Sequence, residues 1–265
     1  METERLDVLL YKKGMFSSRE RAQEHIKKGD IQVDGKIVTK TGKKVLVDSD
    51  IQFTGRKIPY VSRGGLKLEK AIDEYNIDLK DLICMDIGAS TGGFTDCMIQ
   101  NGAHKVYSID VGTDQLHEKL KGHPQIISME NCNIRDLTQE QVEDNIDFIS
   151  IDVSFISLSK ILSKANSFLK DNGRICALIK PQFECGRKYL NKKGVVKDKK
   201  EHKRVINEIL SLFKDENIGN VKLSYSPIKG PNGNIEYLIY GEKSIVEYND
   251  IQVENIVNDA FLTLK

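Results

Sequence analysis

A run of small residues follows an apolar segment in the first half of the chain. Residues 86–96 read D-I-G-A-S-T-G-G-F-T-D. Glycines and small side chains let a backbone approach a ligand closely before a helix begins. The segment has neither the G-x-G-x-x-G pattern of dinucleotide-binding loops nor the G-x-x-x-x-G-K-[ST] pattern of phosphate loops. We expect a ligand to be held here by Asp86, Gly88, Ser90, Gly92, Gly93 and Phe94.

Two further polar residues follow the next apolar runs. Asp110 ends the second run, where a carboxylate can bind both hydroxyls of a ribose. Asn133 and Ile134 follow the third run and suit an adenine, one by hydrogen bonding and the other by packing. Singly, Asp110 or Asn133 is equally explained as a helix cap. A ribose acid without a phosphate cradle indicates S-adenosylmethionine as the cofactor.

These residues need a parallel sheet to bring them together. Apolar runs of strand length alternate with segments of helical period, which indicates a sheet covered on both faces. The runs are Leu82–Ile87, Lys105–Asp110, Gln125–Ser128, Asp147–Asp152 and Arg174–Lys180. Val221–Ile228 and Glu236–Tyr240 complete seven strands as an antiparallel edge pair, so that the last strand is antiparallel. The prediction is a Rossmann-like α/β methyltransferase domain, whose ligands bind at the carboxyl ends of strands.

The first 60 residues predict a separate, smaller α+β unit. A short helix begins near Arg5, and a second one follows Ser18 and ends at Gly29. Ile31–Val33, the Asp34-Gly35 turn and Lys36–Val38 alternate like a hairpin. The predicted domains are residues 1–60 and 61–265, joined by a short linker at about 59–65. The second domain begins with a helix from Leu66 to about Tyr75.

Composition and charge limit the class of protein. The chain has 265 residues, of which 39% are hydrophobic, and a net charge of +1. Residues 1–60 hold 13 Lys+Arg against 9 Asp+Glu, so the smaller unit is basic and the remainder mildly acidic. No apolar run approaches the roughly 20 residues that span a bilayer, and the charged beginning is unlike a signal peptide. We expect a cytoplasmic protein, with five dispersed cysteines that form neither a disulfide framework nor a metal site.

The smaller unit resembles the S4-like RNA-binding domain. The resemblance rests on R-x-D-x-x-L from Arg5, S-R-x-x-A-x-x-x-I from Ser18 and G-D-I-x-V-D-G from Gly29, and covers about residues 3–60. In that family the second helix lies on structured RNA, and cations there contact phosphates without reading bases. The resemblance implies RNA contacts by Arg5, Arg19, Arg21, Lys27 and Lys28, to which we add Arg63 in the linker.

Nearly the whole chain resembles the TlyA family. The motifs are D-I-G-A-S-T-G-G-F-T-D, I-D-V-S-F-I-S, I-K-P-Q-F-E and G-N-I-E-Y-L, preceded by Y-V-S-R-G-G-L-K-L and the S4-like unit. This family comprises FtsJ-like ribosomal RNA 2′-O-methyltransferases that have also been called hemolysins. The resemblance implies a catalytic tetrad of Lys67, Asp152, Lys180 and Glu236, with Asp152 also at the cofactor. It further implies ribosomal RNA or ribosomal subunits as partner and a cytidine ribose as target.

Lys180 is the candidate base, because a ribose hydroxyl is a poor nucleophile until its proton is withdrawn. A free lysine has a pKa of ~10.4, so Lys180 needs burial or the nearby cation of Lys67 to become neutral. The negative charges of Asp152 and Glu236 oppose a lowering of the pKa of Lys180, so these residues are expected to orient the lysines. The sequence is compatible with two roles for Lys180, as a base or as a group that polarises the hydroxyl.

The fourth strand helps to select the chemistry. Amino-group methylation commonly uses Asp/Asn-Pro-Pro-Tyr/Phe here, whereas this chain has D-V-S-F from Asp152 and lacks both prolines. Methylation at carbon through a cysteine is poorly supported, because Cys185 has no second suitably placed cysteine. The sequence therefore favours 2′-O-methylation.

Two other functions remain alternatives. One is a non-catalytic RNA-binding or ribosome-assembly factor, which the tetrad opposes. The other is a membrane-active hemolysin, which the lack of a spanning segment disfavours. The basic stretch 186–203 is explained equally well as a solvated face or as an RNA contact. The sequence specifies neither the modified nucleotide nor the oligomeric state.

Overall fold

The computed structural model describes residues 2–16, 18–55, 58–245 and 250–264. The chain forms two compact units, Met1–Lys57 and Ile58–Lys265. The segment predicted as a linker belongs to the second unit by its contacts, since the Val61 N–H donates to Asp96 Oδ2 (2.7 Å) and Gln100 Nε2 donates to the Pro59 carbonyl (3.0 Å).

The described residues of the first unit form two helices and five short strands. In chain order they are β1 (Thr3–Arg5), α1 (Leu6–Lys12), α2 (Arg19–Lys28), β2 (Ile31–Val33), β3 (Lys36–Ile37), β4 (Lys44–Leu46) and β5 (Ile51–Phe53). β1 pairs with β4, and β2 lies between β3 and β5. Ser18 caps α2 and Gly29 ends it in the left-handed region (φ 80°), as expected. His25 packs between Phe16 and Phe53.

The second unit is built on a seven-stranded sheet of order β11-β12-β10-β9-β6-β7-β8. Its strands are β6 (Ile83–Ile87), β7 (Lys105–Ile109), β8 (Ile126–Met129), β9 (Ile146–Ile151), β10 (Leu169–Ile179), β11 (Ile218–Tyr225) and β12 (Tyr237–Lys243). β12 runs antiparallel to both neighbours, and the strands from β8 to β10 are parallel. This confirms the predicted fold class. β9 returns beside β6, so the switch point of the topology lies between these two strands.

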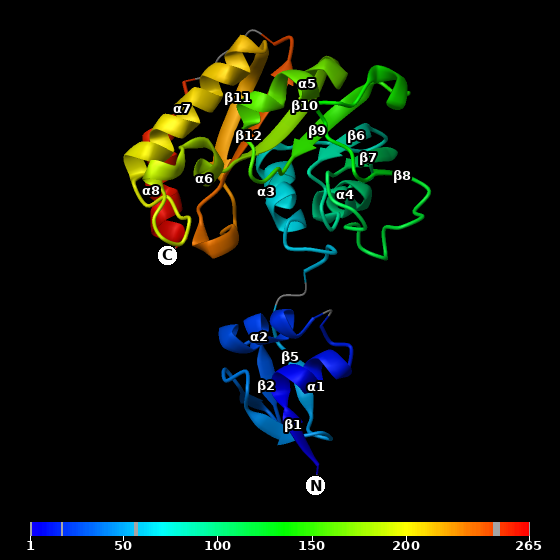
Figure 1. The fold of residues 1–265 in the computed structure, drawn as a ribbon, viewed down its shortest axis with the longest axis vertical. Helices are drawn as coiled ribbons and strands as arrows, with labels where there is room; N and C mark the ends of the chain where they lie inside the picture. Colours follow the sequence, from blue (N-terminus) through cyan, green and yellow to red (C-terminus); the bar gives the residue numbers. More distant parts are fainter. Residues whose placement is uncertain (1, 17, 56–57, 246–249, 265) are drawn as a thin grey trace. The chain divides into compact units, whose positions relative to one another are not determined.

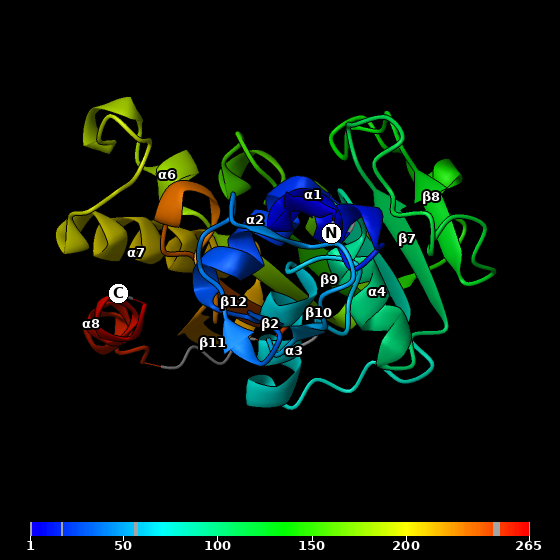
Figure 2. The same ribbon diagram turned by 90° about the horizontal axis from the view of Figure 1, so that it is seen from below.

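Helices cover both faces of this sheet (Figure 1). They are α3 (Gly65–Tyr75), α4 (Gly93–Gln100), α5 (Leu162–Phe168), α6 (Pro181–Glu184), α7 (Lys199–Asp215) and α8 (Val253–Thr263). Residues of α3 and α4 share one hydrophobic cluster with one sheet face, and those of α5, α7 and α8 share another with the opposite face. Figure 2 shows α7 and α8 side by side, away from α3 and α4. Alternate residues of the central strands thus enter different cores, which explains their nearly continuous apolar runs.

Candidate active site

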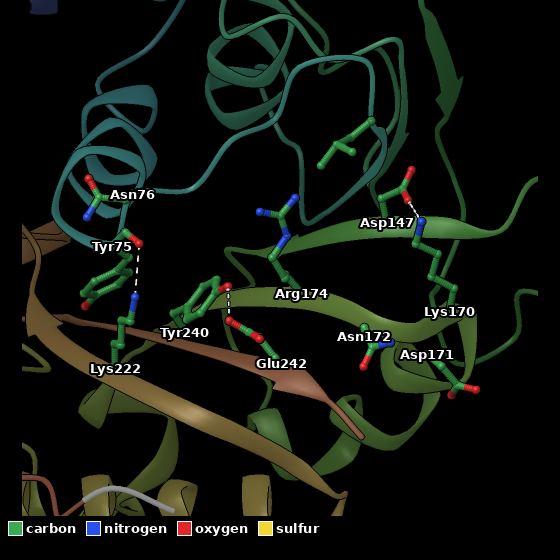
Figure 3. A pocket seen from close by; sticks show the side chains of 11 residues that line it. Tyr75, Asn76, Asp147, Lys170, Asp171, Asn172, Arg174, Lys222, Tyr240 and Glu242 are labelled. Carbon is green, nitrogen blue, oxygen red and sulfur yellow. Dashed lines mark hydrogen bonds and ion pairs between the residues drawn. The ribbon is translucent and has the colours of Figure 1, made fainter. Parts of the chain in front are cut away.

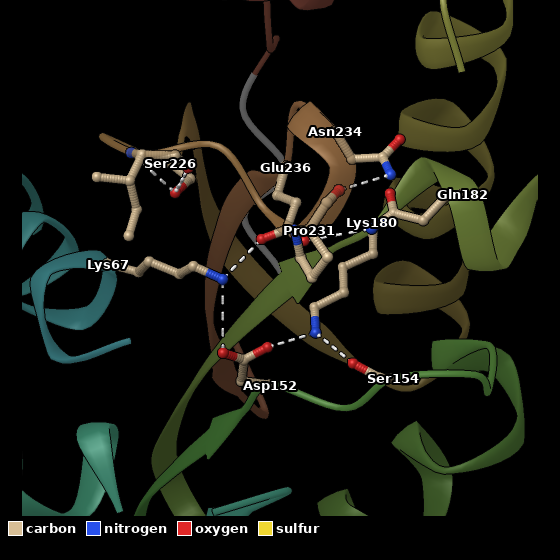
Figure 4. A network of polar contacts seen from close by, with 10 residues as sticks. Lys67, Asp152, Ser154, Lys180, Gln182, Ser226, Pro231, Asn234 and Glu236 are labelled. Atoms are coloured by element: carbon tan, nitrogen blue, oxygen red, sulfur yellow. Dashed lines mark hydrogen bonds and ion pairs between the residues drawn. The ribbon is translucent and has the colours of Figure 1, made fainter. Parts of the chain in front are cut away.

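Four charged side chains from distant parts of the chain meet at the carboxyl edge of the sheet (Figure 4). Lys67 lies on α3, Asp152 and Lys180 directly follow β9 and β10, and Glu236 directly precedes β12. Lys67 Nζ lies 2.7 Å from Glu236 Oε2 and 3.6 Å from Asp152 Oδ2. Lys180 Nζ lies 2.5 Å from Asp152 Oδ1. The structure therefore brings the expected tetrad together as a row of alternating charges, in which Asp152 bridges two ammonium groups.

The tetrad is largely removed from solvent. The side chain of Glu236 is fully buried, and those of Lys180, Lys67 and Asp152 are 7%, 9% and 19% exposed. Burial opposes the charge on Lys67, but the carboxylates of Asp152 and Glu236 outweigh it, so the pKa of Lys67 lies above its ordinary value. The two carboxylates therefore favour the cationic form of Lys67.

Two residues that the sequence reasoning did not select complete the polar network. Ser154 Oγ accepts a hydrogen bond from Lys180 Nζ (3.1 Å), and Gln182 Nε2 donates to Glu236 Oε1 (3.2 Å). Both residues stand inside quoted motifs, two positions after Asp152 and Lys180 respectively. A search for polar residues two positions after a charged residue at a strand end would have identified both. The loop before β12 also approaches closely, since a Cβ on Gly230 would lie 2.1 Å from Glu236 Oε1.

A cavity of about 470 Å³ opens beside Asp152. Six of the expected cofactor residues line it, namely Gly88, Ser90, Asp110, Asn133, Ile134 and Asp152. The sequence reasoning did not select its other lining residues, which are Ile87, Ile109, Val111, Cys132, Arg135, Val153, Ser154, Phe155, Ile156 and Ile161. The cavity lies at the switch point between β6 and β9, where open α/β sheets bind ligands.

The cavity suits an adenosyl group in shape and chemistry. A Cβ on Gly88 would lie 2.7 Å from the Asp152 carbonyl oxygen, so the crevice accepts only glycine there. Asp110 is fixed by two backbone N–H groups, of Ser90 to Oδ2 (2.8 Å) and of Gly112 to Oδ1 (2.7 Å), and each oxygen keeps a lone pair for a ribose hydroxyl. Ile134 supplies an apolar wall. The residues present therefore fit S-adenosylmethionine.

The remaining expected cofactor residues lie outside the cavity lining. Gly92 starts α4 in the left-handed region (φ 86°), and Gly93 packs so closely that a Cβ would lie 2.2 Å from Ser62 Oγ. Phe94 is 3% exposed and packs in the core with α3. Packing explains both glycines, because Gly92 lies against Leu116 and Leu120 and Gly93 lies against residues 62–65.

Asp86 also lies outside the lining and is fully buried. Its carboxylate accepts from Thr95 Oγ1 (2.7 Å) and Ser150 Oγ (3.0 Å), which join β6 to α4 and β9. Burial raises the pKa of Asp86 to about 7, because these hydroxyl donors only partly replace water. Asp86 thus stabilises the loop between β6 and α4 without lining the cavity itself.

An exposed aromatic side chain stands at the mouth of the cavity. Phe155 is 91% exposed and has a φ of +65°, which is uncommon for a bulky residue. Its ring lies 5.0 Å from that of Phe183, and Lys180 Nζ lies 5.9 Å from the Phe183 ring. Glu184 anchors the same loop by accepting from Ser157 Oγ (2.5 Å) and the Leu158 N–H (2.9 Å). Two aromatic rings, tilted by 50° to each other, thus lie beside the tetrad.

The arginines expected to bind RNA in the first unit have an internal partner. Arg5 donates two hydrogen bonds to Asp7 (3.0 and 3.1 Å) and Arg19 donates one (3.2 Å). Both arginine side chains remain about half exposed, at 49% and 47%. Lys27 and Lys28 are exposed, with Lys28 paired to Glu24, and Arg21 is half-buried. Arg63 is exposed in the second unit and does not join the tetrad or the cavity lining.

A larger cavity of about 720 Å³ lies at the opposite edge of the sheet (Figure 3). Its charged groups are engaged internally: Lys222 Nζ donates to the Tyr75 carbonyl (3.1 Å), Arg174 Nη2 to the Asp78 carbonyl (2.8 Å), and Tyr240 Oη to Glu242 Oε1 (2.8 Å). This cavity contains none of the residues selected from the sequence. The smaller cavity beside the tetrad is therefore the candidate site.

Within the described ranges, no cluster of histidine, cysteine and acidic side chains is arranged to hold a metal ion. All five cysteines are free thiols. No helix in the described part of the chain combines the length and apolar character needed to cross a bilayer.

Comparison with known proteins agrees with this geometry. Residues 60–243 match the FtsJ-like methyltransferase family and residues 4–51 match the S4 domain. Hemolysin A of Brachyspira hyodysenteriae is 41% identical over 89% of this chain and 98% of its own length. The 16S/23S rRNA (cytidine-2′-O)-methyltransferase TlyA of Mycobacterium tuberculosis is 33% identical over 89% of this chain and 88% of its own.

A solved structure of a protein from Streptococcus thermophilus extends the similarity to three dimensions. It is 42% identical, has a TM-score of 0.79, and the match covers 99% of this chain and 97% of that one. With both family matches, this chain belongs to the TlyA family, S-adenosylmethionine-dependent FtsJ-like RNA methyltransferases with an S4 domain at the amino end.

Proposed function

We propose that the protein transfers a methyl group from S-adenosylmethionine to a ribose 2′-hydroxyl of ribosomal RNA, with a cytidine as target. The observation that carries the proposal is the position of Asp152, which lines the cofactor cavity and also contacts Lys67 and Lys180. A hydroxyl bound at these lysines would lie next to the cavity that fits the methyl donor. The relative that methylates cytidine riboses in 16S and 23S rRNA supports the choice of substrate.

The proposed mechanism assigns a different role to each tetrad residue. S-adenosylmethionine supplies an electrophilic methyl group, which needs an oxygen roughly in line behind it. Lys180, in its neutral form, would accept the 2′-hydroxyl proton while the oxygen forms the new O–C bond and the methyl–sulfur bond breaks, with its electron pair remaining on the sulfur of the departing S-adenosylhomocysteine. Asp152 orients both lysines. Lys67 stays protonated, held by Glu236, and stabilises the negative charge that develops on the oxygen.

The cofactor contacts divide into a direct and a supporting group. We assign direct contact to Gly88, Ser90, Asp110, Asn133, Ile134 and Asp152, supported by their place in the cavity lining. Asp86, Gly92, Gly93 and Phe94 are assigned to holding the loop in shape, supported by their burial and packing. Removing a residue of the second group would then lower affinity through the loop rather than through a lost contact.

The S4 domain is proposed to bind the ribosomal RNA or subunit. Lys27, Lys28 and Arg21 would contact phosphates, and Arg5 and Arg19 would do so with the N–H groups that Asp7 leaves available. Arg63 is proposed as a further phosphate contact, supported by its exposure. Because ribosomal RNA is the proposed substrate, the cytoplasm is the proposed place of action.

Substitution of Lys180 tests the mechanism. Lys180→Ala should lower kcat by about 10²–10⁴-fold and leave S-adenosylmethionine affinity nearly unchanged, since a general base typically contributes that factor. Lys180→Arg keeps the charge but cannot lose its proton, so a base role predicts an equal loss. The substrate is rRNA from cells lacking the gene. The readout is mass-spectrometric mapping of the 2′-O-methyl groups in that rRNA.

Lys164→Ala is the matched control, since Lys164 lies on α5 and outside both the tetrad and the cavity lining. It should retain normal activity. Activity of Lys180→Arg near that of the unmodified protein would refute the base role, and an absence of any gene-dependent 2′-O-methyl group would refute the proposed reaction.

A further inference from the structure

Residues 187–197 form a hairpin between α6 and α7, here called the basic hairpin. The segment holds Arg187, Lys188, Lys192, Lys193 and Lys197, with no acidic residue. All five cations are exposed, and none has a carboxylate partner within the ranges that the structure describes. Lys199 and Lys203, just beyond the hairpin, differ: they bind Asn258 (2.8 Å) and Glu254 (2.5 Å) on α8.

The basic hairpin has an ordered backbone of its own. Leu190 and Val196 form an antiparallel bridge, and Asn191 closes the tip. Asn191 Oδ1 accepts from the N–H groups of Lys193 (2.8 Å) and Val195 (3.0 Å), while its own N–H donates to the Val195 carbonyl (3.1 Å). The tip lysines are therefore carried on a turn that is fixed by local hydrogen bonds.

Buried polar groups attach the basic hairpin to the active-site loop. Asn234 is 4% exposed and lies two residues before Glu236. Its Oδ1 accepts from the Val196 N–H (3.3 Å) and its Nδ2 donates to the Gly194 carbonyl (3.1 Å). His202, fully buried, contacts the Val196 carbonyl (3.1 Å) and Tyr237 Oη (2.8 Å). Figure 1 shows the yellow-green hairpin segment beside the orange loop that precedes β12.

We propose that the basic hairpin is a phosphate-binding surface for the RNA strand that carries the target ribose. The inference rests on the proposed function and extends it, because it gives the second unit an RNA contact of its own. A strand that presents a ribose to Lys180 must carry its neighbouring phosphates past the loop of Glu236, where Asn234 holds the hairpin. Unpaired cations on a fixed turn neutralise phosphates with little loss of backbone entropy.

Salt dependence of RNA binding tests this inference in the full-length protein. The variant Lys192→Gln/Lys193→Gln removes two tip charges and leaves the backbone bonds of the hairpin unchanged. Each lost phosphate contact should flatten the slope of log K against log[salt] by about 0.7–0.9, so the expected change is about 1.5. The probe is total rRNA from cells lacking the gene, with binding measured by filter retention between 50 and 300 mM KCl. The control Lys80→Gln/Lys164→Gln removes the same charge elsewhere in the unit and should keep the original slope.

A charge reversal, Lys192→Glu/Lys193→Glu, should weaken binding more than the glutamine variant, while cofactor affinity and the unfolding midpoint stay unchanged in both. An unaltered slope in the hairpin variants, or an equal change in the control, would overturn the inference. Methyl transfer is measured separately on the same RNA. A hairpin-dependent slope without methyl transfer would uphold the phosphate surface while rejecting the proposed reaction.

Discussion

The two units each bury one aspartate completely, and they stabilise it in opposite ways. Asp7 in the first unit accepts hydrogen bonds from Arg5, Arg19 and Gln23. The bond from Arg5 contributes most, and it holds the pKa of Asp7 well below its usual range. The donors to Asp86 in the second unit are neutral, namely two hydroxyls and the backbone of Thr95, and burial raises its pKa to about 7. Charged donors favour the ionised acid, whereas hydroxyls do not outweigh its loss of water.

This difference shows which carboxylates are paired with cationic side chains in each unit. The first unit places two of the arginines expected on RNA around Asp7, so these residues serve the fold as well as any ligand. The second unit places its buried ammonium groups around Asp152 and Glu236 and supplies none to Asp86. The units should therefore respond to pH with opposite sign.

The largest expected effect is on the pH dependence of the second unit. Asp86 has a raised native pKa, so its contribution to stability is complete below about pH 4 and is lost as the pH rises to about 7. The slope approaches about 1.4 kcal/mol per pH unit. Asp86→Asn removes this pH-dependent contribution to stability. The free energy of unfolding of the variant, relative to that of the unmodified protein, should therefore rise by about 3 kcal/mol between pH 5 and 8.

Urea unfolding, with amide exchange of β6 and β9 peptides to identify the unit, measures this change. The exposed Asp171→Asn serves as control and should show no such rise. A pH-independent difference for Asp86→Asn would mean that the buried acid stays ionised in the native state.

A smaller effect of opposite sign is expected for the first unit. Asp7 has a lowered native pKa, so its contribution is present above about pH 4 and is lost as the pH falls toward the native value. Asp7→Asn should destabilise the unit by about 2 kcal/mol at pH 7, a value reduced because both arginines are half exposed and regain water.

Amide exchange of α1 and α2 measures the loss, with exposed Asp48→Asn as the control. The difference between Asp7→Asn and the unmodified protein should shrink below pH 4. A difference that grows in acid would reverse the assigned sign.

The smallest effect separates structural from ligand-binding cations within the first unit. Arg5→Gln loses two hydrogen bonds to Asp7 and should lower the stability of the first unit by less than Asp7→Asn does. Lys27→Gln should leave stability unchanged but flatten the salt dependence of rRNA binding by about 0.8. Equal loss of stability in the two variants would show that Lys27 also serves the fold.

The sheet was predictable because its central strands are buried on both faces and are therefore largely apolar. Two features of the strands could not be predicted from apolar runs. β1 consists of the polar residues Thr3–Arg5 and exists through pairing with Lys44–Leu46, some 40 positions away. β10 begins at Leu169 rather than Arg174, because Leu169 pairs with Ile146 across a register irregularity that no local pattern marks. Long-range pairing, rather than local preference, decides both.

The candidate site was predictable in its members more than in its contacts. The identity of the tetrad came from motifs, but the contact between Lys67 and Glu236 spans 169 positions and follows only from the fold. A glycine-rich loop does not tell which of its residues face a ligand, so Gly88 and Gly93 looked alike although one lines the cavity and the other packs on Ser62. Likewise, the local sequence does not show whether Arg5 and Arg19 are hydrogen-bonded to Asp7 or are available to bind a phosphate.

The tetrad pairs two lysines with two carboxylates and so carries no net positive charge, which has a consequence for substrate choice. Such a centre does not attract a distant polyanion, so capture must depend on cations elsewhere in the chain. Ionic strength should then govern how often an encounter succeeds while leaving the turnover of captured RNA unaffected. A free nucleoside, too short to reach those cations, would be discriminated against by size alone, although it carries the same hydroxyl.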